Sequence, residues 1–145
     1  MNTKVIFNAR KTDGNTAFEG FITFNEIDVN IGNGHDGAKF VAPISGLYKF
    51  SFFGVTGYGY PGLPTNYTMI NVMKNYVMKY VIFDDNNENY HVGNNLAMTW
   101  IWDLKKEEHV AFEVTGRRVV ATYSSPIIFT GELIHKNLNL YQKIN

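Results

Sequence analysis

An acidic run at residues 84–88 (Asp-Asp-Asn-Asn-Glu) is the chain's densest group of side chains that could hold a metal ion. Calcium takes about six to eight oxygen ligands, and clustered carboxylates and amides could supply several of them. The run copies the first half of an EF-hand loop, but Asn89 and Asn95 stand where that loop needs Gly and Glu. Two interpretations remain: a calcium site of another kind that uses Asp84 and Asp85, or a solvated turn between two strands.

Other residue types that support catalysis lack the spacing that catalysis needs. The chain contains no cysteine, which excludes a thiol nucleophile, a disulfide framework and a zinc–thiolate site. It contains neither a G-x-S-x-G nucleophile elbow nor a G-x-x-x-x-G-K-[ST] phosphate-binding loop. No H-E-x-x-H or H-x-H spacing occurs among the histidines, which are His35, His91, His109 and His135. We therefore expect no enzymatic activity and no cofactor other than the candidate calcium ion.

Two short segments have a composition suited to binding a ligand. Tyr58 and Tyr60 lie among glycines and prolines in a loop at residues 57–65, where ordinary loop packing is the alternative. Arg117 and Arg118 follow a glycine in a turn between strands and could contact an anionic ligand. An exposed, solubilising pair is the alternative for the two arginines.

Charge and hydropathy argue against two classes of partner. The 13 Lys and Arg residues balance 13 Asp and Glu residues, whereas nucleic-acid-binding proteins usually show a basic surface. No stretch reaches the ~18 consecutive apolar residues of a membrane span, and Met1–Lys11 lacks the apolar segment of a signal peptide. Asn66 begins an N-glycosylation sequon, which matters only in a eukaryotic secretory pathway. We expect no nucleic-acid partner and no membrane insertion.

The elements that must carry these residues are almost all strands. Short apolar or alternating runs recur along the chain, separated by polar segments rich in Gly and Asn. This pattern predicts an antiparallel β-sandwich or barrel in one domain over residues 1–136, with residues 137–145 as a C-terminal tail or edge extension. The predicted strands are Thr3–Ala9, Phe21–Phe24, Lys39–Pro43, Gly46–Thr56, Tyr67–Lys74, Tyr76–Phe83, Leu96–Leu104, His109–Thr115 and Pro126–His135.

The strand predicted at Gly46–Thr56 is apolar on both of its faces. The two faces carry Tyr48, Phe50 and Phe52 on one side, and Leu47, Phe53 and Val55 on the other. A sandwich strand normally shows one face to water. We therefore expect a second copy of the chain to cover the outer face; the alternative is a curled sheet that covers this face with its own loops.

A set of spaced residues resembles the signature of the C1q domain. That signature ends in G-x-Y-x-F-x-[FY], and its matching residues here are Phe24, Asn30, Phe40, Gly46, Tyr48, Phe50 and Phe52. His35 stands where the signature has an aromatic residue or leucine, and the spacing from there to Phe40 is two residues short. The stretch Phe129–Ile134 (FTGELI) is similar to the family's terminal F-x-G-x-L-[IL] strand.

The resemblance implies a ten-stranded antiparallel jelly-roll sandwich of the C1q/TNF-like type, assembled as a homotrimer. It also implies a secreted or surface-associated binding head, of the kind used in innate immunity, that recognises a protein, glycan or other surface ligand through multivalent loop contacts. A structural or attachment tip of a fibre or coat and a cytokine-like receptor ligand are the alternatives.

Aromatic residues are the natural material for such a trimer interface, because they bury large areas. We assign Tyr48, Phe50 and Phe52 to the threefold axis, together with Tyr76 and Tyr80 from the next pair of strands. The alternative is that all of these side chains belong to the core of the monomer. Some members of the family bind calcium in loops near the trimer apex, which also favours the calcium interpretation of the acidic run.

Overall fold

The computed structural model describes residues 4–16, 19–57, 67–85 and 94–136 of the chain. These residues form eleven strands. These residues form no helix, so the expected all-β class is confirmed. The strands are β1 (Ile6–Lys11), β2 (Glu19–Phe21), β3 (Glu26–Ile31), β4 (Phe40–Val41), β5 (Gly46–Thr56), β6 (Tyr67–Lys74), β7 (Val77–Asp85), β8 (Asn95–Leu104), β9 (His109–Gly116), β10 (Val119–Val120) and β11 (Ile127–Lys136).

The strand count differs from the expected ten, and two of the strands were not predicted from the sequence. β10 has only two residues, which is too short for a periodic pattern. β3 does alternate, with Ile27, Val29 and Ile31 at every second position, but it lies at the edge of its sheet and leaves Val29 and Ile31 exposed. The alternation was therefore a usable signal for a strand with little buried surface.

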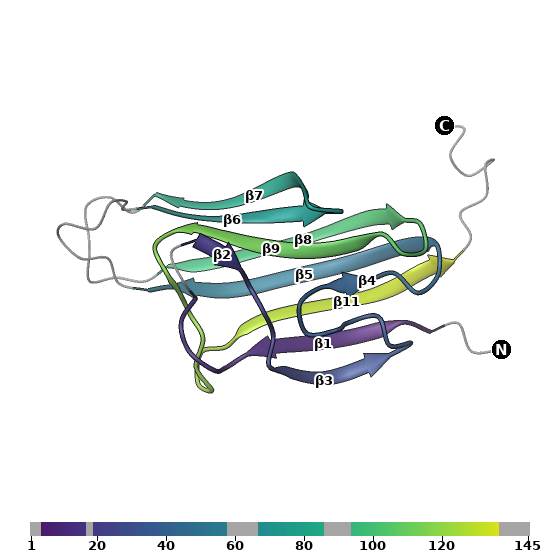
Figure 1. Cartoon of the computed structure of the whole chain (residues 1–145), viewed down its shortest axis with the longest axis horizontal. Helices are drawn as coiled ribbons and strands as arrows, with labels where there is room; N and C mark the ends of the chain where they lie inside the picture. Colours follow the sequence, from purple (N-terminus) through teal and green to yellow (C-terminus); the bar gives the residue numbers. More distant parts are fainter. Residues whose placement is uncertain (1–3, 17–18, 58–66, 86–93, 137–145) are drawn as a thin grey trace.

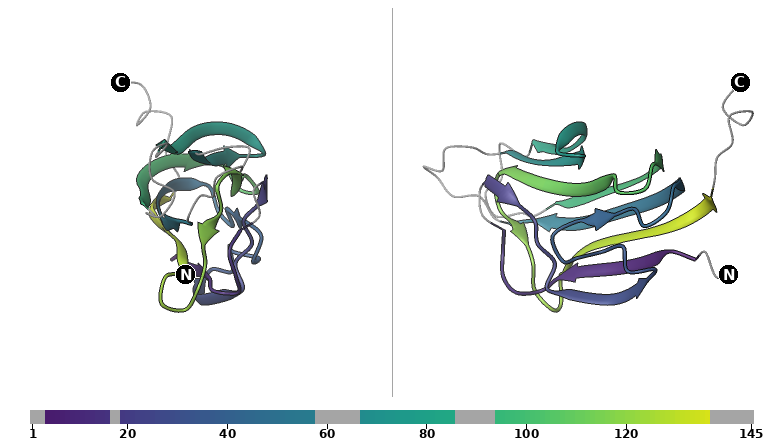
Figure 2. Two further views of the ribbon diagram at one scale, coloured as in Figure 1. Left: turned by 90° about the vertical axis from the view of Figure 1, so that its left-hand side faces the viewer. Right: turned by 45° about the vertical axis from the view of Figure 1, so that its right-hand side comes forward.

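The strands form two antiparallel sheets that pack face to face (Figures 1 and 2). Sheet A has the order β10-β5-β11-β1-β3, and β8 also pairs with β5. Sheet B has the order β2-β9-β6-β7, and β4 also pairs with β9. Figure 1 shows the end of β5, the start of β6, the end of β7 and the start of β8 at one end of the sandwich, opposite the start of β1 and the end of β11.

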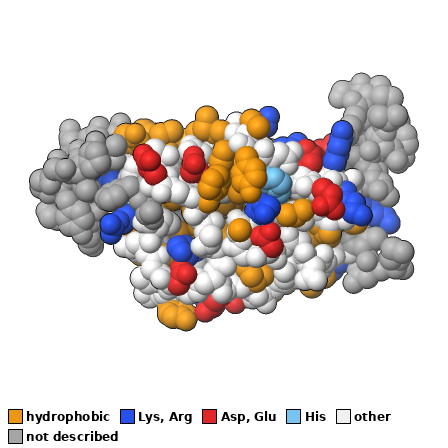
Figure 3. Space-filling view, viewed as in Figure 1, with side chains coloured by type: hydrophobic (Ala, Val, Ile, Leu, Met, Phe, Trp, Pro, Cys, Tyr) orange, Lys and Arg blue, Asp and Glu red, His pale blue; other side chains and the backbone are white. Residues whose placement is uncertain are grey.

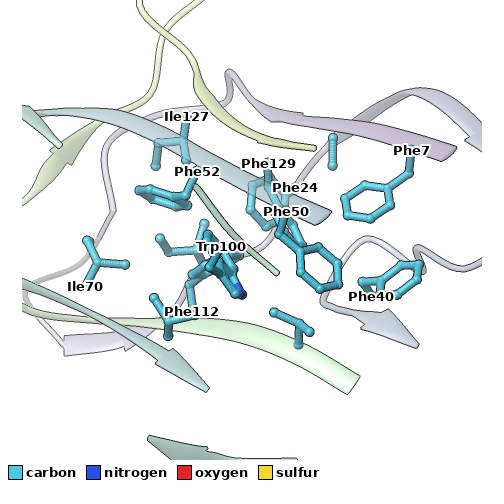
Figure 4. Packing of buried hydrophobic residues seen from close by; sticks show 14 of the residues in the cluster. Phe7, Phe24, Phe40, Phe50, Phe52, Ile70, Trp100, Phe112, Ile127 and Phe129 are labelled. Atoms are coloured by element: carbon cyan, nitrogen blue, oxygen red, sulfur yellow. The ribbon is translucent and has the colours of Figure 1, made fainter. Parts of the chain in front are cut away.

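Aromatic rings from both sheets fill the space between them (Figure 4). Phe50 of β5 lies within ring-contact distance of Phe129, Trp100 and Phe40, at 5.8, 5.5 and 5.6 Å between centroids. Phe112 of sheet B packs edge-on against Phe129 of sheet A at 4.6 Å. Because such pairs add about 0.5–1.5 kcal/mol each beyond the burial of their area, this cluster contributes to the packing of the two sheets.

The assignment of Tyr48, Phe50 and Phe52 to a trimer axis is wrong. All three side chains are buried within the monomer, so they have no surface left for a neighbouring chain. Phe53, on the opposite face of β5, is exposed. The alternation along the strand was read correctly, but a period of two does not say which face is inside.

The histidine that departs from the expected signature is part of the core. His35 is 4% exposed and packs beside Phe7, Phe24 and Phe129, with ring centroids 5.2, 5.4 and 5.7 Å away. Asn30 holds its backbone, because the Asn30 amide donates to the His35 carbonyl at 2.9 Å and accepts from the His35 N–H at 3.1 Å. Burial lowers the pKa of His35 to about 4. The neutral imidazole of His35 therefore packs in the core where the C1q signature has an aromatic residue or leucine.

Candidate binding surfaces

The edge of the sandwich formed by β7 and β8 is rich in exposed apolar side chains. β7 is the last strand of sheet B: within the described residues it pairs with β6 on one side and with no strand on the other. Tyr80 of β7 stacks on Trp102 of β8 at 5.5 Å, so the edges of the two sheets meet here. The exposed apolar side chains of β7 form what we name the edge surface: Val77, Met78, Tyr80, Val81 and Phe83. Phe53 of β5 and Ile101 of β8 are exposed on the outer face of sheet A.

Tyr76, which was predicted to lie at a subunit interface, is directed away from this edge. Its ring lies 4.5 Å from His109 of β9 and 5.7 Å from Phe21 of β2, measured between centroids. Both of those strands lie on the far side of β6 from β7. Tyr76 therefore lies on the outer face of sheet B, whereas Tyr80 belongs to the edge surface and stays a predicted interface residue. The sequence patterns indicated no role for Phe21 or His109.

The outer face of sheet A contains a hollow of about 410 Å³. Lys49 and Glu132 face each other across β5 and β11 at its rim. The side-chain oxygen of Asn8 is buried there without a hydrogen-bond partner. The other lining residues are Ile6, Phe7, Val29, Ser51, Thr130 and Gly131. The hollow is thus partly polar, and its charged groups come from neighbouring strands.

The structure assigns Asp84, a predicted calcium ligand, to a different partner. Its Oδ2 accepts a hydrogen bond from Arg117 Nη2 at 2.8 Å, and its Oδ1 accepts one from Asn94 Nδ2 at 3.1 Å. A guanidinium this close opposes cation binding at Asp84, and the calcium assignment stays a prediction. The side chain of Asp85 and residues 86–88 lie outside the described part of the chain. Across the described residues, no three His, Asp or Glu side chains are grouped to hold a metal ion.

Arg117 is a structural residue and not an exposed ligand contact as predicted. It is 1% exposed, its N–H donates to the Tyr67 carbonyl at 2.7 Å, and its carbonyl accepts from the Thr68 hydroxyl at 3.2 Å. Its side chain joins the β9–β10 turn to the end of β7 through Asp84. Arg118 is exposed and stays a candidate ligand contact. The remaining predicted sites, at Tyr58, Tyr60 and Asn66, lie outside the described residues.

Comparison with known proteins agrees with the two-sheet geometry. The sequence profile of the C1q domain matches residues 6–134, which is nearly the whole chain. The chain belongs to the C1q domain family. Curated protein sequences, by contrast, give no significant match to this C1q domain.

Solved structures show the same fold at low sequence identity. The globular domain of zebrafish complement 1qA protein is similar to this C1q domain with a TM-score of 0.73 and 16% identity, over 92% of this chain and 99% of that one. Murine APRIL, crystallised at pH 8.0, is similar with a TM-score of 0.64 and 8% identity, over 88% of this chain and 98% of that one. At these identities the likeness concerns the fold alone.

Membership of the C1q domain family carries some general properties. These domains are trimeric, non-enzymatic ligand-binding heads, and members of the family are typically secreted. In the part of this chain that is described, no helix is long and apolar enough to cross a membrane.

Proposed function

We propose that this chain is one subunit of a homotrimeric binding head, secreted or surface-associated, that binds a protein or glycan ligand and performs no catalysis. The observation that carries the trimer is the edge surface. Soluble monomers rarely leave large apolar side chains gathered in this way unless a partner covers them. β7 also ends its sheet, and an exposed apolar edge strand promotes association with another chain.

A cyclic trimer needs two different surfaces on each subunit, because every contact joins one patch to a different patch on the neighbour. The edge surface supplies the first patch. The outer face of sheet A supplies the second, with Phe53, Ile101 and the hollow beside Lys49 and Glu132. In this arrangement three subunits close a ring and cover most of their exposed apolar side chains.

Light scattering on the purified protein tests the trimer. We expect a mass of about three times the 16.5 kDa of one chain at micromolar concentration. Tyr80→Lys places a charge in the edge surface and should shift the protein to monomer, since a buried unpaired charge opposes association. Tyr123→Lys changes an exposed tyrosine outside the edge surface, with 74% of the side chain in solvent, and should leave the trimer intact. A wild-type protein that stays monomeric would overturn the proposal.

The trimer matters for binding because it repeats each site three times. Multivalent attachment to a surface can raise the apparent affinity about 100-fold or more without a new contact. We therefore expect the Tyr80→Lys monomer to bind a soluble monovalent ligand like the wild type and to bind the same ligand on a surface far more weakly. Equal retention of both proteins on the surface would contradict this role of the trimer.

A further inference from the structure

The hairpin turn between β6 and β7 has an unfavourable residue at its second central position. Asn75 and Tyr76 both have positive φ, at 52° and 62°, and they join the paired residues Lys74 and Val77. Two-residue hairpin turns of this kind strongly prefer Asn followed by Gly. Asn75 fits, but a tyrosine in the left-handed region is strained. Strain of this kind clusters at functional sites, which makes the exposed side chain of Tyr76 a candidate ligand contact.

The turn places the Tyr76 ring on the outer face of sheet B and holds it there. The backbone N–H of Asn75 donates to the His109 carbonyl, and the His109 N–H donates to Asn75 Oδ1, both at 2.9 Å. Tyr76 then lies between His109 and Phe21, nearly perpendicular to the Phe21 ring at 77°. Tyr76 is 54% exposed and Phe21 is 50% exposed, so half of each ring faces solvent.

A row of polar side chains lies beside these rings. Phe21 is paired in the sheet with Glu113 of β9, which is paired in turn with Asn71 of β6. The Asn71 amide donates to Glu113 Oε1 at 3.2 Å and to the Thr115 hydroxyl at 3.4 Å. Asn71 is only 8% exposed, and its Oδ1 has no hydrogen-bond partner. The row therefore places the Glu113 carboxylate, oriented by Asn71, next to the half-exposed aromatic rings.

We infer that Phe21, Tyr76 and Glu113 form a binding site for a neutral saccharide, in which Asn71 positions the Glu113 carboxylate. A pyranose ring with equatorial substituents has a flat C–H face, whose weakly positive hydrogens suit the negative face of an aromatic ring. Its hydroxyls can donate to the Glu113 carboxylate. Figure 3 shows a hydrophobic patch on the face that carries sheet B, with a histidine beside it.

Two other ligand classes fit this site less well. A quaternary ammonium ion is usually enclosed by several aromatic faces, whereas these rings are half open to solvent. An apolar peptide would cover the Glu113 carboxylate without supplying donors, which is costly for a charged acceptor. A polyhydroxylated ligand satisfies both the rings and the carboxylate. This inference rests on the proposed binding function and names the ligand class and the site for it.

Calorimetric titration of the purified protein with cellohexaose and with chitohexaose tests the site. We expect at least one of these neutral hexasaccharides to bind. Tyr76→Gly removes the ring and installs the residue that the turn prefers, so it should fold at least as well and bind roughly tenfold or more weakly. Phe21→Ala and Glu113→Gln should also weaken binding. Tyr123→Ala removes another exposed tyrosine and, as the control, should leave binding unchanged.

Three results would overturn the site: no binding of either hexasaccharide at millimolar concentration, full binding by Tyr76→Gly, or displacement of the sugar by choline. Thermal melting of each variant separates loss of the site from loss of the fold. Light scattering on the same samples separates this inference from the proposed trimer. A trimer without sugar binding overturns the saccharide site alone, and a monomer that binds sugar overturns the trimer alone.

Discussion

Replacing His35 by phenylalanine should remove a defined part of the acid sensitivity of the fold. His35 is buried among Phe7, Phe24 and Phe129, and this burial lowers its pKa to about 4, opposed only in part by Asp36. Its pKa in the unfolded chain is about 6.5. As the pH falls from 6.5 toward 4, the unfolded chain takes up a proton that the folded chain does not. The stability of the fold therefore falls with the pH through this window.

The magnitude follows from the two pKa values. One pKa unit corresponds to about 1.4 kcal/mol, so the full effect of His35 is about 3 kcal/mol, of which about 2 kcal/mol is lost between pH 7 and pH 4.5. Phenylalanine does not titrate and keeps this stability. The variant does lose the hydrogen bond from the Gly37 N–H to His35 Nδ1, of 3.0 Å, at a cost of about 1 kcal/mol at every pH. The variant should therefore lose about 2 kcal/mol less stability than the wild type between pH 7 and pH 4.5.

Urea unfolding of both proteins at pH 7 and pH 4.5 gives the required free energies of unfolding. The protein concentration must be the same throughout, because the stability of the proposed trimer depends on it. Other titrating groups are common to both proteins and cancel in the difference. His135→Phe, at an exposed position of β11, is the matched control and should keep the wild-type pH dependence. Equal losses of stability in the wild type and in His35→Phe would refute the reasoning.

Two further predictions test corrections that the structure made. Arg117→Ala leaves the Asp84 carboxylate without its buried partner and should lower the free energy of unfolding by about 3 kcal/mol in urea unfolding. Tyr123→Ala, at an exposed position, is the control and should change it by less than about 0.5 kcal/mol. Phe50→Ala should cost about 3–5 kcal/mol in urea unfolding because Phe50 is a core residue. Phe53→Ala should chiefly weaken the proposed trimer, which light scattering detects. A milder effect of Phe50→Ala than of Phe53→Ala on unfolding would contradict the assigned faces.

Several features of this protein could be predicted from its sequence because they depend on neighbouring residues along the chain. The bounds of β5 and β6 agree with the predicted strands at Gly46–Thr56 and Tyr67–Lys74. Both are long strands with regular patterns and clear turn residues at their ends. The spacing of the aromatic signature also indicated the C1q domain family, since that pattern lies within one short part of the chain.

The positions that only the tertiary structure decided depend on contacts between distant residues. The alternation along β5 has the same period whichever face is inside, and the packing of Phe50 on Trp100 and Phe129 settles the direction. Arg117 could be recognised as a buried residue only through Asp84, which lies 33 positions earlier in the chain.

Tyr76 shows the same division between local pattern and three-dimensional position. The hairpin turn was expected between Tyr67–Lys74 and Tyr76–Phe83, but the direction of the Tyr76 ring follows from the positive φ of the turn and from contacts with β2 and β9. Local patterns determine strands because hydrogen bonding and side-chain alternation act over a few residues. The surface on which a side chain lies is determined by the pairing of strands that are far apart in the sequence.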